Sequence, residues 1–325
     1  MTNTRFYLDY NASTPVLYEA QQALCSSCSI FGNPSSVHYE GQQARILLQK
    51  ARGQIAQFLG GEERNLFFTS GATEAAATLL NPFYQMGKKI VTMSQLYVGA
   101  TEHACVLSGG RFPPQQVQYI AVDEEGKICQ KELENLLQQH DKSQGPPLVA
   151  VQLANSETGV IQDLQPLEAI IRQYGGFLLV DATQYIGKLP FDIQKIAGDF
   201  FFFSAHKMGG VKGVGAIYAR SGLWAPLPLL SGGGQEEGRR AGTPALPLIC
   251  AFACAAEIVQ KQVQQESERL AKLQKLLEKG LKQVCPSLFI YGEKTQRLPN
   301  TTLFSIPEKD AQTLQIFLDL AGFSV

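Results

Sequence analysis

The feature that most constrains the fold is a run of four phenylalanines, Phe200 to Phe203, that ends directly in Ser204, His206 and Lys207. A short aromatic run bounded by turn-forming residues predicts a buried strand. Side chains that follow such a strand in a parallel sheet lie at its carboxyl edge, where ligands bind. A lysine held there beside a hydroxyl and an imidazole can form a Schiff base with an aldehyde. A structural lysine in a loop is the alternative.

Strand, turn and helix patterns alternate through residues 66–218. The segments that read as strands are residues 66–70, 89–93, 117–122, 148–153, 177–180, 200–204 and 214–218. Helical segments, notably 130–140 and 164–174, fall between several of them. This alternation predicts an α/β fold with a mostly parallel, seven-stranded sheet that helices cover on both faces.

The pattern changes after Thr243. One long helical stretch is expected over residues 246–284, followed by strand-like segments at 288–291 and 301–306 and by a helix at 310–321. Residues 323–325 read as the beginning of a further strand, and residues 6–10 as a short N-terminal strand. We therefore expect a second, smaller α+β domain joined to the first by the long helix.

Composition argues against several classes of partner. The 325 residues carry a formal net charge of -1, which gives no electrostatic reason to expect binding to nucleic acid or to an anionic membrane. Residues 246–256 form the most apolar stretch, which is too short to span a bilayer. The first ten residues include Asp9 and lack the apolar segment of a targeting signal. A cytoplasmic location is the resulting expectation.

The seven cysteines do not suggest a disulfide framework, because they are odd in number and scattered through a long chain. Cys25 and Cys28 form a single C-x-x-C, which is the spacing of a metal or redox pair. No second pair or nearby histidine completes a zinc site, so we expect two plain buried thiols and no metal.

Three further features fit one cofactor. Asp181 follows a predicted strand, Gly71 to Glu74 lead into a helix whose backbone N–H groups and Thr73 hydroxyl suit a phosphate, and His103 could stack on a ring. Pyridoxal phosphate needs a lysine for its aldehyde, a carboxylate for its pyridine nitrogen and donors for its phosphate. Each residue also has a plain structural alternative: Asp181 as a turn former, His103 as a helix cap and Ser204 as a buried hydroxyl bonded to backbone.

The chain resembles the cysteine desulfurases of class-V aminotransferase fold, the type that supplies sulfur for iron–sulfur clusters. Eight motifs carry the resemblance in family order: residues 7–12 (YLDYNA), 32–38 (GNPSSVH), 69–74 (TSGATE), 102–103 (EH), 154–159 (ANSETG), 181–184 (DATQ), 204–207 (SAHK) and 233–243 (GGQEEGRRAGT). The resemblance implies a fold-type I transferase, with a large cofactor-binding domain over residues 16–245 and a small domain built from residues 1–15 and 246–325.

The resemblance also implies a role for each matched residue. Lys207 would bind the cofactor aldehyde and act as base, Asp181 would pair with the pyridine nitrogen, Gln184 would bond the ring hydroxyl, and His103 would stack on the ring and move protons. The remaining implied roles are phosphate binding by the Ala72 backbone, Thr73, Ser204, His206 and, from the other subunit of a homodimer, Thr243; contact with cofactor or substrate by Asn155; and binding of the substrate carboxylate by Arg240, assisted by Asn33.

One departure from the family concerns its nucleophile. Family members take sulfur from L-cysteine onto a loop cysteine and pass it to an acceptor or cluster-scaffold protein. That loop should follow a segment like residues 320–325, and no cysteine follows Cys285 here. The chain is then expected to be a fragment of a longer desulfurase, a truncated and silent paralogue that acts as a partner, or a lyase that needs no thiol. Another fold-type I reaction, such as transamination or β-elimination, is the remaining alternative.

Overall fold

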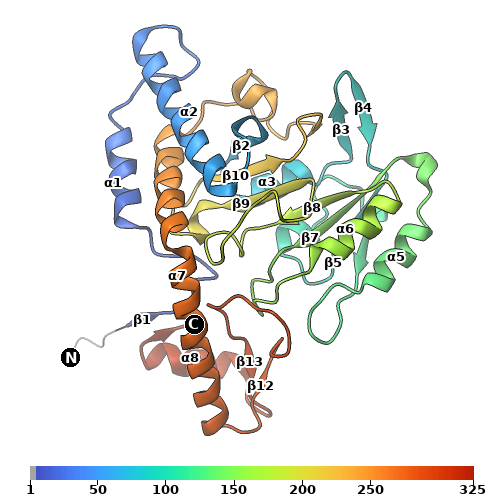
Figure 1. The fold of residues 1–325 in the computed structure, drawn as a ribbon, viewed down its shortest axis with the longest axis vertical. Helices are drawn as coiled ribbons and strands as arrows, with labels where there is room; N and C mark the ends of the chain where they lie inside the picture. The colour runs from blue at the N-terminus through green and yellow to red at the C-terminus, as the bar shows by residue number, and fades with distance from the viewer. Residues whose placement is uncertain (1–4) are drawn as a thin grey trace.

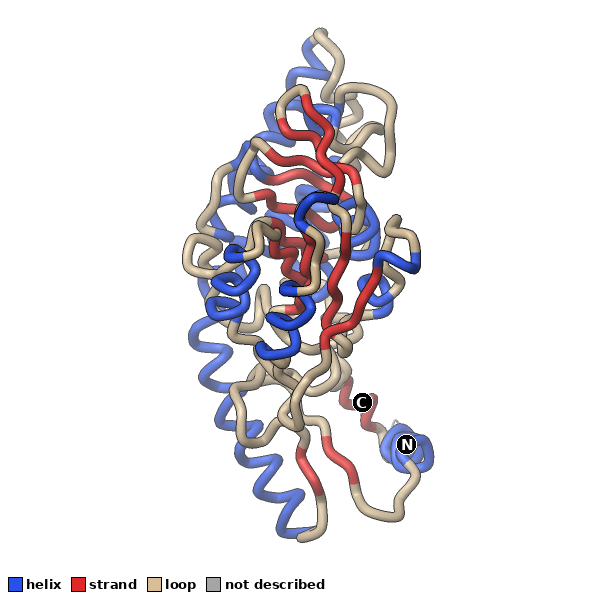
Figure 2. Tube along the Cα trace, turned by 90° about the vertical axis from the view of Figure 1, so that its right-hand side faces the viewer, coloured by secondary structure: helices blue, strands red, loops and turns tan. Residues whose placement is uncertain are grey.

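The computed structural model describes residues 5–325 and shows a wide upper body above a smaller lower part (Figure 1). The long helix α7, Leu246–Val284, runs through both, as the side view also shows (Figure 2). The helix predicted over residues 246–284 is therefore confirmed.

A seven-stranded sheet forms the centre of the upper body. Its strand order is β2-β10-β9-β8-β7-β5-β6. The strands are β2 Leu66–Thr69, β5 Gln95–Gly99, β6 Val117–Ile120, β7 Pro147–Gln152, β8 Phe177–Asp181, β9 Phe200–Ser204 and β10 Gly215–Ala219. Strands β9, β8, β7, β5 and β6 run parallel, whereas β10 is antiparallel to both β9 and β2. The expected α/β fold with a mostly parallel sheet is confirmed.

The phenylalanine run packs on both faces of this sheet. Phe201 and Phe203 belong to the core that contains α1, α2, α5, α6 and the first half of α7, whereas Phe200 and Phe202 belong to the core beneath α3 and α4. Side chains alternate between faces along a strand, so a continuous apolar run is stable only where both faces are covered. The helices of the upper body are α1 Tyr18–Ser27, α2 Tyr39–Leu59, α3 Ala72–Leu79, α4 Ala104–Leu107, α5 Gln130–Gln138 and α6 Leu164–Gln173.

One sheet strand was predicted in the wrong place. Residues 89–93 were expected in the sheet, but β4 (Lys89–Thr92) pairs with β3 (Phe83–Met86), which in turn pairs with β11 (Trp224–Pro226), in a separate antiparallel sheet. The position in the central sheet belongs to β5. The burial pattern explains the error: Lys89 and Ile90 are exposed, whereas Leu96 and Val98 of β5 are fully buried.

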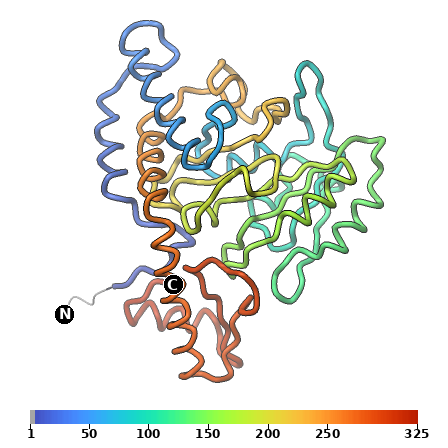
Figure 3. Tube along the Cα trace, in the orientation of Figure 1, coloured from blue at the N-terminus to red at the C-terminus, as the bar shows by residue number. Residues whose placement is uncertain are grey.

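The lower part contains the second half of α7, the hairpin β12 (Phe289–Ile290) and β13 (Phe304–Ser305), and α8 (Ala311–Leu320). The N-terminal strand β1 (Phe6–Tyr7) pairs in parallel with β14 (Phe323–Ser324). In the backbone trace, the first described residues and the C-terminus lie at the level where the upper body meets the lower part (Figure 3). This pairing agrees with a small domain that includes the first residues, although the boundaries at residues 15 and 245 stay a prediction.

Within residues 5–325, α7 is the single helix long and apolar enough by length and composition to cross a membrane. Its apolar residues, such as Ile249 and Phe252, are buried in the core with α1 and α2. We therefore assign the first half of α7 to the core of the fold.

Candidate active site

The carboxyl edge of the central sheet gathers most of the predicted site residues. Lys207 lies in the short helix η4 (Ala205–Lys207) directly after β9, and Asp181 is the last residue of the neighbouring strand β8. The positive charge of Lys207 acts on the Asp181 carboxylate, and His103 also lies within electrostatic range of it. The order of strands thus brings together three residues that are far apart in the sequence.

The amine of Lys207 is half-buried and faces the N-terminal turn. Its Nζ donates to the backbone oxygen of Asn11 and, at 3.0 Å, to that of Ala12. Burial lowers the pKa of Lys207, while the carboxylates of Asp9, Asp181 and Glu157 oppose this shift. The amine is thereby easier to deprotonate than a solvated lysine, as a nucleophile requires.

Asp181 is a buried carboxylate with little pairing. Its Oδ1 accepts one hydrogen bond of 2.8 Å from the backbone N–H of Thr183, and no ion pair to it occurs within residues 5–325. Burial raises its pKa, offset by the bond from Thr183 and by the charges of His103 and Lys207. The Thr183 hydroxyl beside it is buried without a partner.

His103 caps the N-terminus of α4. Its Nδ1 accepts a hydrogen bond of 3.2 Å from the backbone N–H of Cys105, and the Cys105 thiol lies 3.1 Å from the same atom. A backbone donor at Nδ1 leaves the proton of the neutral ring on Nε2. The helix-cap alternative for His103 is thus correct, and it is compatible with a role at the ring because Nε2 remains free to donate.

The predicted phosphate side lies at the start of α3. Ala72 is its first residue and Thr73 follows, so their backbone N–H groups belong to the unpaired first turn. A Cβ built on Gly71 would meet only the Ser204 hydroxyl, at 3.9 Å, which leaves room in front of this helix end. Ser204 Oγ donates weakly to Val214 O at 3.4 Å, as the backbone-bonded alternative expected. Burial and the charges of Lys207 and Lys212 lower the pKa of His206, whose Nδ1 lies 3.3 Å from Ser13 Oγ.

Gln184 and Asn155 are held by hydrogen bonds near this group. Gln184 Nε2 donates to the same Asn11 oxygen that Lys207 contacts, at 3.0 Å. Asn155 Nδ2 donates to Thr101 O at 3.0 Å, next to His103, and its Oδ1 accepts from the backbone of Glu157 and Thr158. The Asn155 amide therefore shapes the loop over residues 155–160.

Three predicted residues lie outside this group. Arg240 forms a two-point ion pair with Glu74, at 2.9 and 3.3 Å, and Thr243 is exposed on the loop before α7. Asn33 lies in the loop between α1 and α2, whose neighbouring residues Pro34 and Ser35 line a cleft of about 520 Å3 together with residues 234–237. No hydrogen bond joins Arg240, Thr243 or Asn33 to Lys207 or Asp181 in the described part of the chain. The cleft lies away from the sheet edge that holds Lys207.

Sequence reasoning missed three residues of the site. The sequence patterns assign no role to Asn11, which falls within a matched motif, or to Cys105 and Lys188. The signal for Lys188 is a lysine within the largely apolar segment Tyr185-Ile186-Gly187-Lys188-Leu189. Burial, with the charge of Asp181 as the next cause, raises the pKa of Cys105 to about 12, so its thiol stays neutral.

The prediction that the C-x-x-C pair is buried was wrong. Cys25 and Cys28 were expected as buried thiols, but both are exposed, because they lie on the outer side of α1 and at its end. No group of three or more metal-ligating side chains occurs in residues 5–325.

The residues of the sheet edge fit pyridoxal phosphate. A buried carboxylate without an ion-pair partner suits a protonated ring nitrogen, a half-buried amine suits an aldehyde, and an open helix N-terminus beside a serine suits a phosphate. The unpartnered Thr183 hydroxyl is a further donor at the site.

Comparisons with known proteins agree with this arrangement. Residues 6–325 match the model of the aminotransferase class-V family. The chain is 32% identical to a cysteine desulfurase IscS of Dictyoglomus turgidum, covering 98% of this chain and 80% of the relative, and 36% identical to one of Proteus mirabilis, covering 97% and 78%. It also resembles the crystal structure of a NifS-like protein from Rickettsia africae, with a TM-score of 0.89, 32% identity and coverage of 99% and 87%.

Proposed function

The chain belongs to the class-V aminotransferase family, and we infer from this premise that it is a pyridoxal-phosphate-dependent cysteine desulfurase. The reaction converts L-cysteine to L-alanine and transfers its sulfur to an acceptor thiol, which becomes a persulfide for iron–sulfur cluster or thio-cofactor synthesis. The observation that carries this function is the position of Lys207 and Asp181 at the ends of adjacent parallel strands, beside the open N-terminus of α3.

The cofactor supplies an electron sink for the bond that breaks in the substrate. Lys207 Nζ would bind the cofactor and move the proton at the substrate Cα, for which its lowered pKa suits it. The negative charge of Asp181 would favour a proton on the ring nitrogen. His103 would stack on the ring and could donate from Nε2, because its Nδ1 accepts from the Cys105 N–H.

The remaining predicted residues position the ligands. Ala72 and Thr73 at the start of α3, with the neighbouring Ser204, would bind the phosphate, because N–H groups and the helix dipole stabilise an anion there. We propose that His206 joins them. Asn155 shapes the loop over residues 155–160 and donates to Thr101 O, two residues before His103. Arg240, with Asn33, is proposed to bind the substrate carboxylate, which requires its guanidinium to leave or share Glu74.

We propose a homodimer in which Thr243 completes the partner's phosphate site. The exposed position of Thr243 supports this, since the residue lies on the surface and not in the group around Lys207. Phe31, Val37 and Tyr39 at the turn between α1 and α2 are also strongly exposed, as expected of an interface. Light scattering after size exclusion tests the dimer. A sulfur-acceptor protein and a cytoplasmic location remain predictions.

The decisive experiment combines cofactor spectroscopy with product analysis. The protein reconstituted with pyridoxal phosphate should show a visible absorbance band that borohydride reduction converts to a covalent adduct on the Lys207 peptide. With L-cysteine and a reductant it should release sulfide and form alanine. Pyruvate in place of alanine would indicate β-elimination, and an external complex without sulfide release would indicate a silent paralogue.

A further inference from the structure

Lys188 is a second lysine buried beside Lys207. It is 8% exposed, and it lies one turn after Gln184 in the segment that follows β8. Its Nζ donates to Gln184 Oε1 and, at 2.6 Å, to Asn11 Oδ1. Both acceptors are neutral amide oxygens, and Lys188 forms no ion pair within the described residues.

A buried ammonium group without a carboxylate partner is costly, because the low-dielectric interior stabilises its charge poorly. The groups that face Lys188 are the amides of Gln184 and Asn11, with Asn300 donating to the same Asn11 oxygen at 2.9 Å. The charge that acts on it is that of Lys207, which is also positive. Burial, followed by this repulsion, lowers the pKa of Lys188 to about 7. A nearby anion would stabilise these two neighbouring lysines, because it would offset the repulsion between their positive charges.

Lys188 also determines which way the Gln184 amide points. The ammonium form of Lys188 has donors and no acceptor, so Gln184 turns Oε1 toward Lys188 and Nε2 away from it. Nε2 now donates to Asn11 O, on the side where Lys207 lies. Gln184 therefore presents an N–H donor to the region of the cofactor ring.

We propose that Lys188 is a positioning residue for the cofactor: through Gln184 it orients a donor toward the oxygen on the cofactor ring and supplies positive charge that favours the ionised form of that oxygen. The inference rests on the proposed function. It adds a residue to the site and also explains why the chain tolerates an unpaired buried lysine.

Two variants separate orientation from charge. Lys188→Met removes both the donor and the charge, whereas Lys188→Gln keeps a donor and removes the charge. Lys195→Met is the matched control, since Lys195 is exposed and pairs only with Asp192 on the surface. Each purified protein is reconstituted with pyridoxal phosphate, and its cofactor affinity and the pH midpoint of its visible band are measured by titration.

We expect Lys188→Met to bind the cofactor about tenfold more weakly, as for the loss of one hydrogen bond to a charged group. The pH midpoint of the visible band should rise by about one unit in both Lys188 variants, because a nearby positive charge no longer favours loss of the proton. The control should match the parent. In a Gln184→Leu background, Lys188→Met should have a much smaller effect on affinity, because the orienting path is already lost.

Thermal unfolding of the cofactor-free proteins distinguishes this role from a structural one. Lys188→Met should keep or raise the unfolding midpoint, because it removes a buried charge, whereas a merely structural lysine would lower it when replaced. An unchanged pH midpoint in both Lys188 variants would overturn the proposal, and Lys188→Gln carries the test if Lys188→Met does not fold. A parent protein without a Lys207-dependent visible band would instead overturn the proposed function.

Discussion

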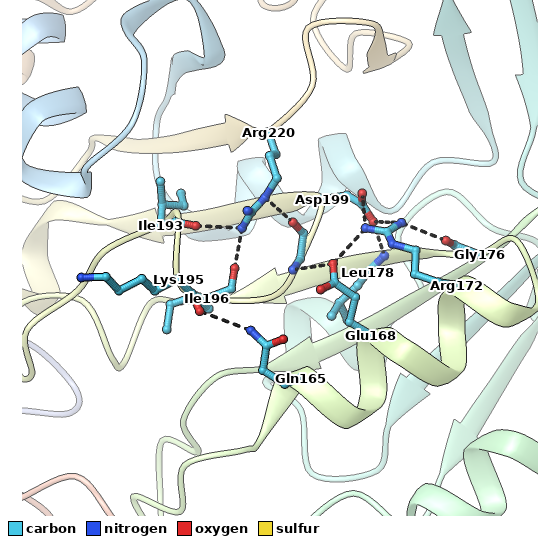
Figure 4. Close-up of polar contacts among 11 residues, drawn as sticks. Gln165, Glu168, Arg172, Gly176, Leu178, Ile193, Lys195, Ile196, Asp199 and Arg220 are labelled. Carbon is cyan, nitrogen blue, oxygen red and sulfur yellow. Dashed lines mark hydrogen bonds and ion pairs between the residues drawn. The ribbon is translucent and has the colours of Figure 1, made fainter.

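The two edges of the central sheet differ in how their carboxylates are bonded: Asp199 at the amino edge is partly buried and paired, whereas Asp181 at the carboxyl edge is buried and has no ion pair in residues 5–325. At the amino edge, Asp199 precedes β9, and both of its oxygens accept from the Arg172 guanidinium, at 2.7 and 3.0 Å, with a third bond of 2.7 Å from Leu178 N (Figure 4). At the carboxyl edge, Asp181 ends β8 and accepts from Thr183 N at 2.8 Å, without an ion pair in residues 5–325. The carboxylate at the amino edge is therefore paired with an arginine, and the one at the carboxyl edge is left for a ligand to pair with.

The amino edge is built for stability. Arg172 also pairs with Glu168, and Arg220 donates to the carbonyl oxygens of Ile193, Ile196 and Gly198, which closes the loop before β9 (Figure 4). At the carboxyl edge, Asp181 is buried without an ion pair in residues 5–325, and burial raises its pKa. A buried carboxylate with a shifted pKa at the ligand-binding edge of a sheet indicates function there.

Among the variants at the two edges, Lys207→Ala should lower activity the most. Loss of the amine that binds the cofactor and moves the proton should lower kcat by at least about 10³-fold, with the fold intact. Alanine formation from L-cysteine measures activity, and circular dichroism checks the fold. Lys195→Ala is the control, and a Lys207→Ala protein that keeps its covalent cofactor would contradict the assignment.

Asp181→Asn should lower kcat by about 10²-fold, because the neutral amide no longer holds a proton on the cofactor ring. Its cofactor-free stability should not fall, since burial already opposes the charged form of Asp181 and raises its pKa. Urea unfolding and steady-state kinetics on the same preparation test both parts. A loss of stability without loss of activity would reverse the roles assigned to the two edges.

Asp199→Asn is the matched change at the amino edge. It should lower stability and leave activity nearly unchanged. It removes an acceptor of the Arg172 fork and should cost about 1–2 kcal/mol of unfolding free energy, since Arg172 is partly exposed and its pairing is screened by water. Activity should stay within about twofold of the parent at temperatures well below unfolding. A kcat decrease as large as that of Asp181→Asn would show that the two edges do not differ in function.

The smallest expected effect is on the alkylation rate of Cys105, at the carboxyl edge of the sheet. Burial and the charge of Asp181 raise the pKa of Cys105 to about 12, so at pH 8 it should alkylate much more slowly than the exposed Cys25 and Cys28. Mass spectrometry of peptides after timed iodoacetamide treatment gives the three rates. In Asp181→Asn, Cys105 should react somewhat faster, and equal rates at all three cysteines in the parent would contradict the expected burial.

The sequence could predict the site residues that end or directly follow buried strands. Lys207 and Asp181 follow apolar runs, and parallel topology brings strand ends together, so their meeting could be anticipated without coordinates. Asn11 and Lys188 could not be assigned, because their roles depend on hydrogen bonds between segments 177 residues apart. The sequence did not predict β5 as a strand of the central sheet, because β4, in the hairpin that precedes it, has a similar strand pattern.

The pairing of β1 with β14 has a consequence for the order of folding. Phe6 pairs with Phe323 and Tyr7 with Ser324, so the strand that leads into Asn11 and Ala12 closes a loop of nearly the whole chain. Contacts of such long sequence separation cost the most chain entropy and form late. During synthesis the strand β1 remains without its partner while the sheet can already assemble. The carbonyl groups that hold the Lys207 amine therefore come into place late, after β1 and β14 have met.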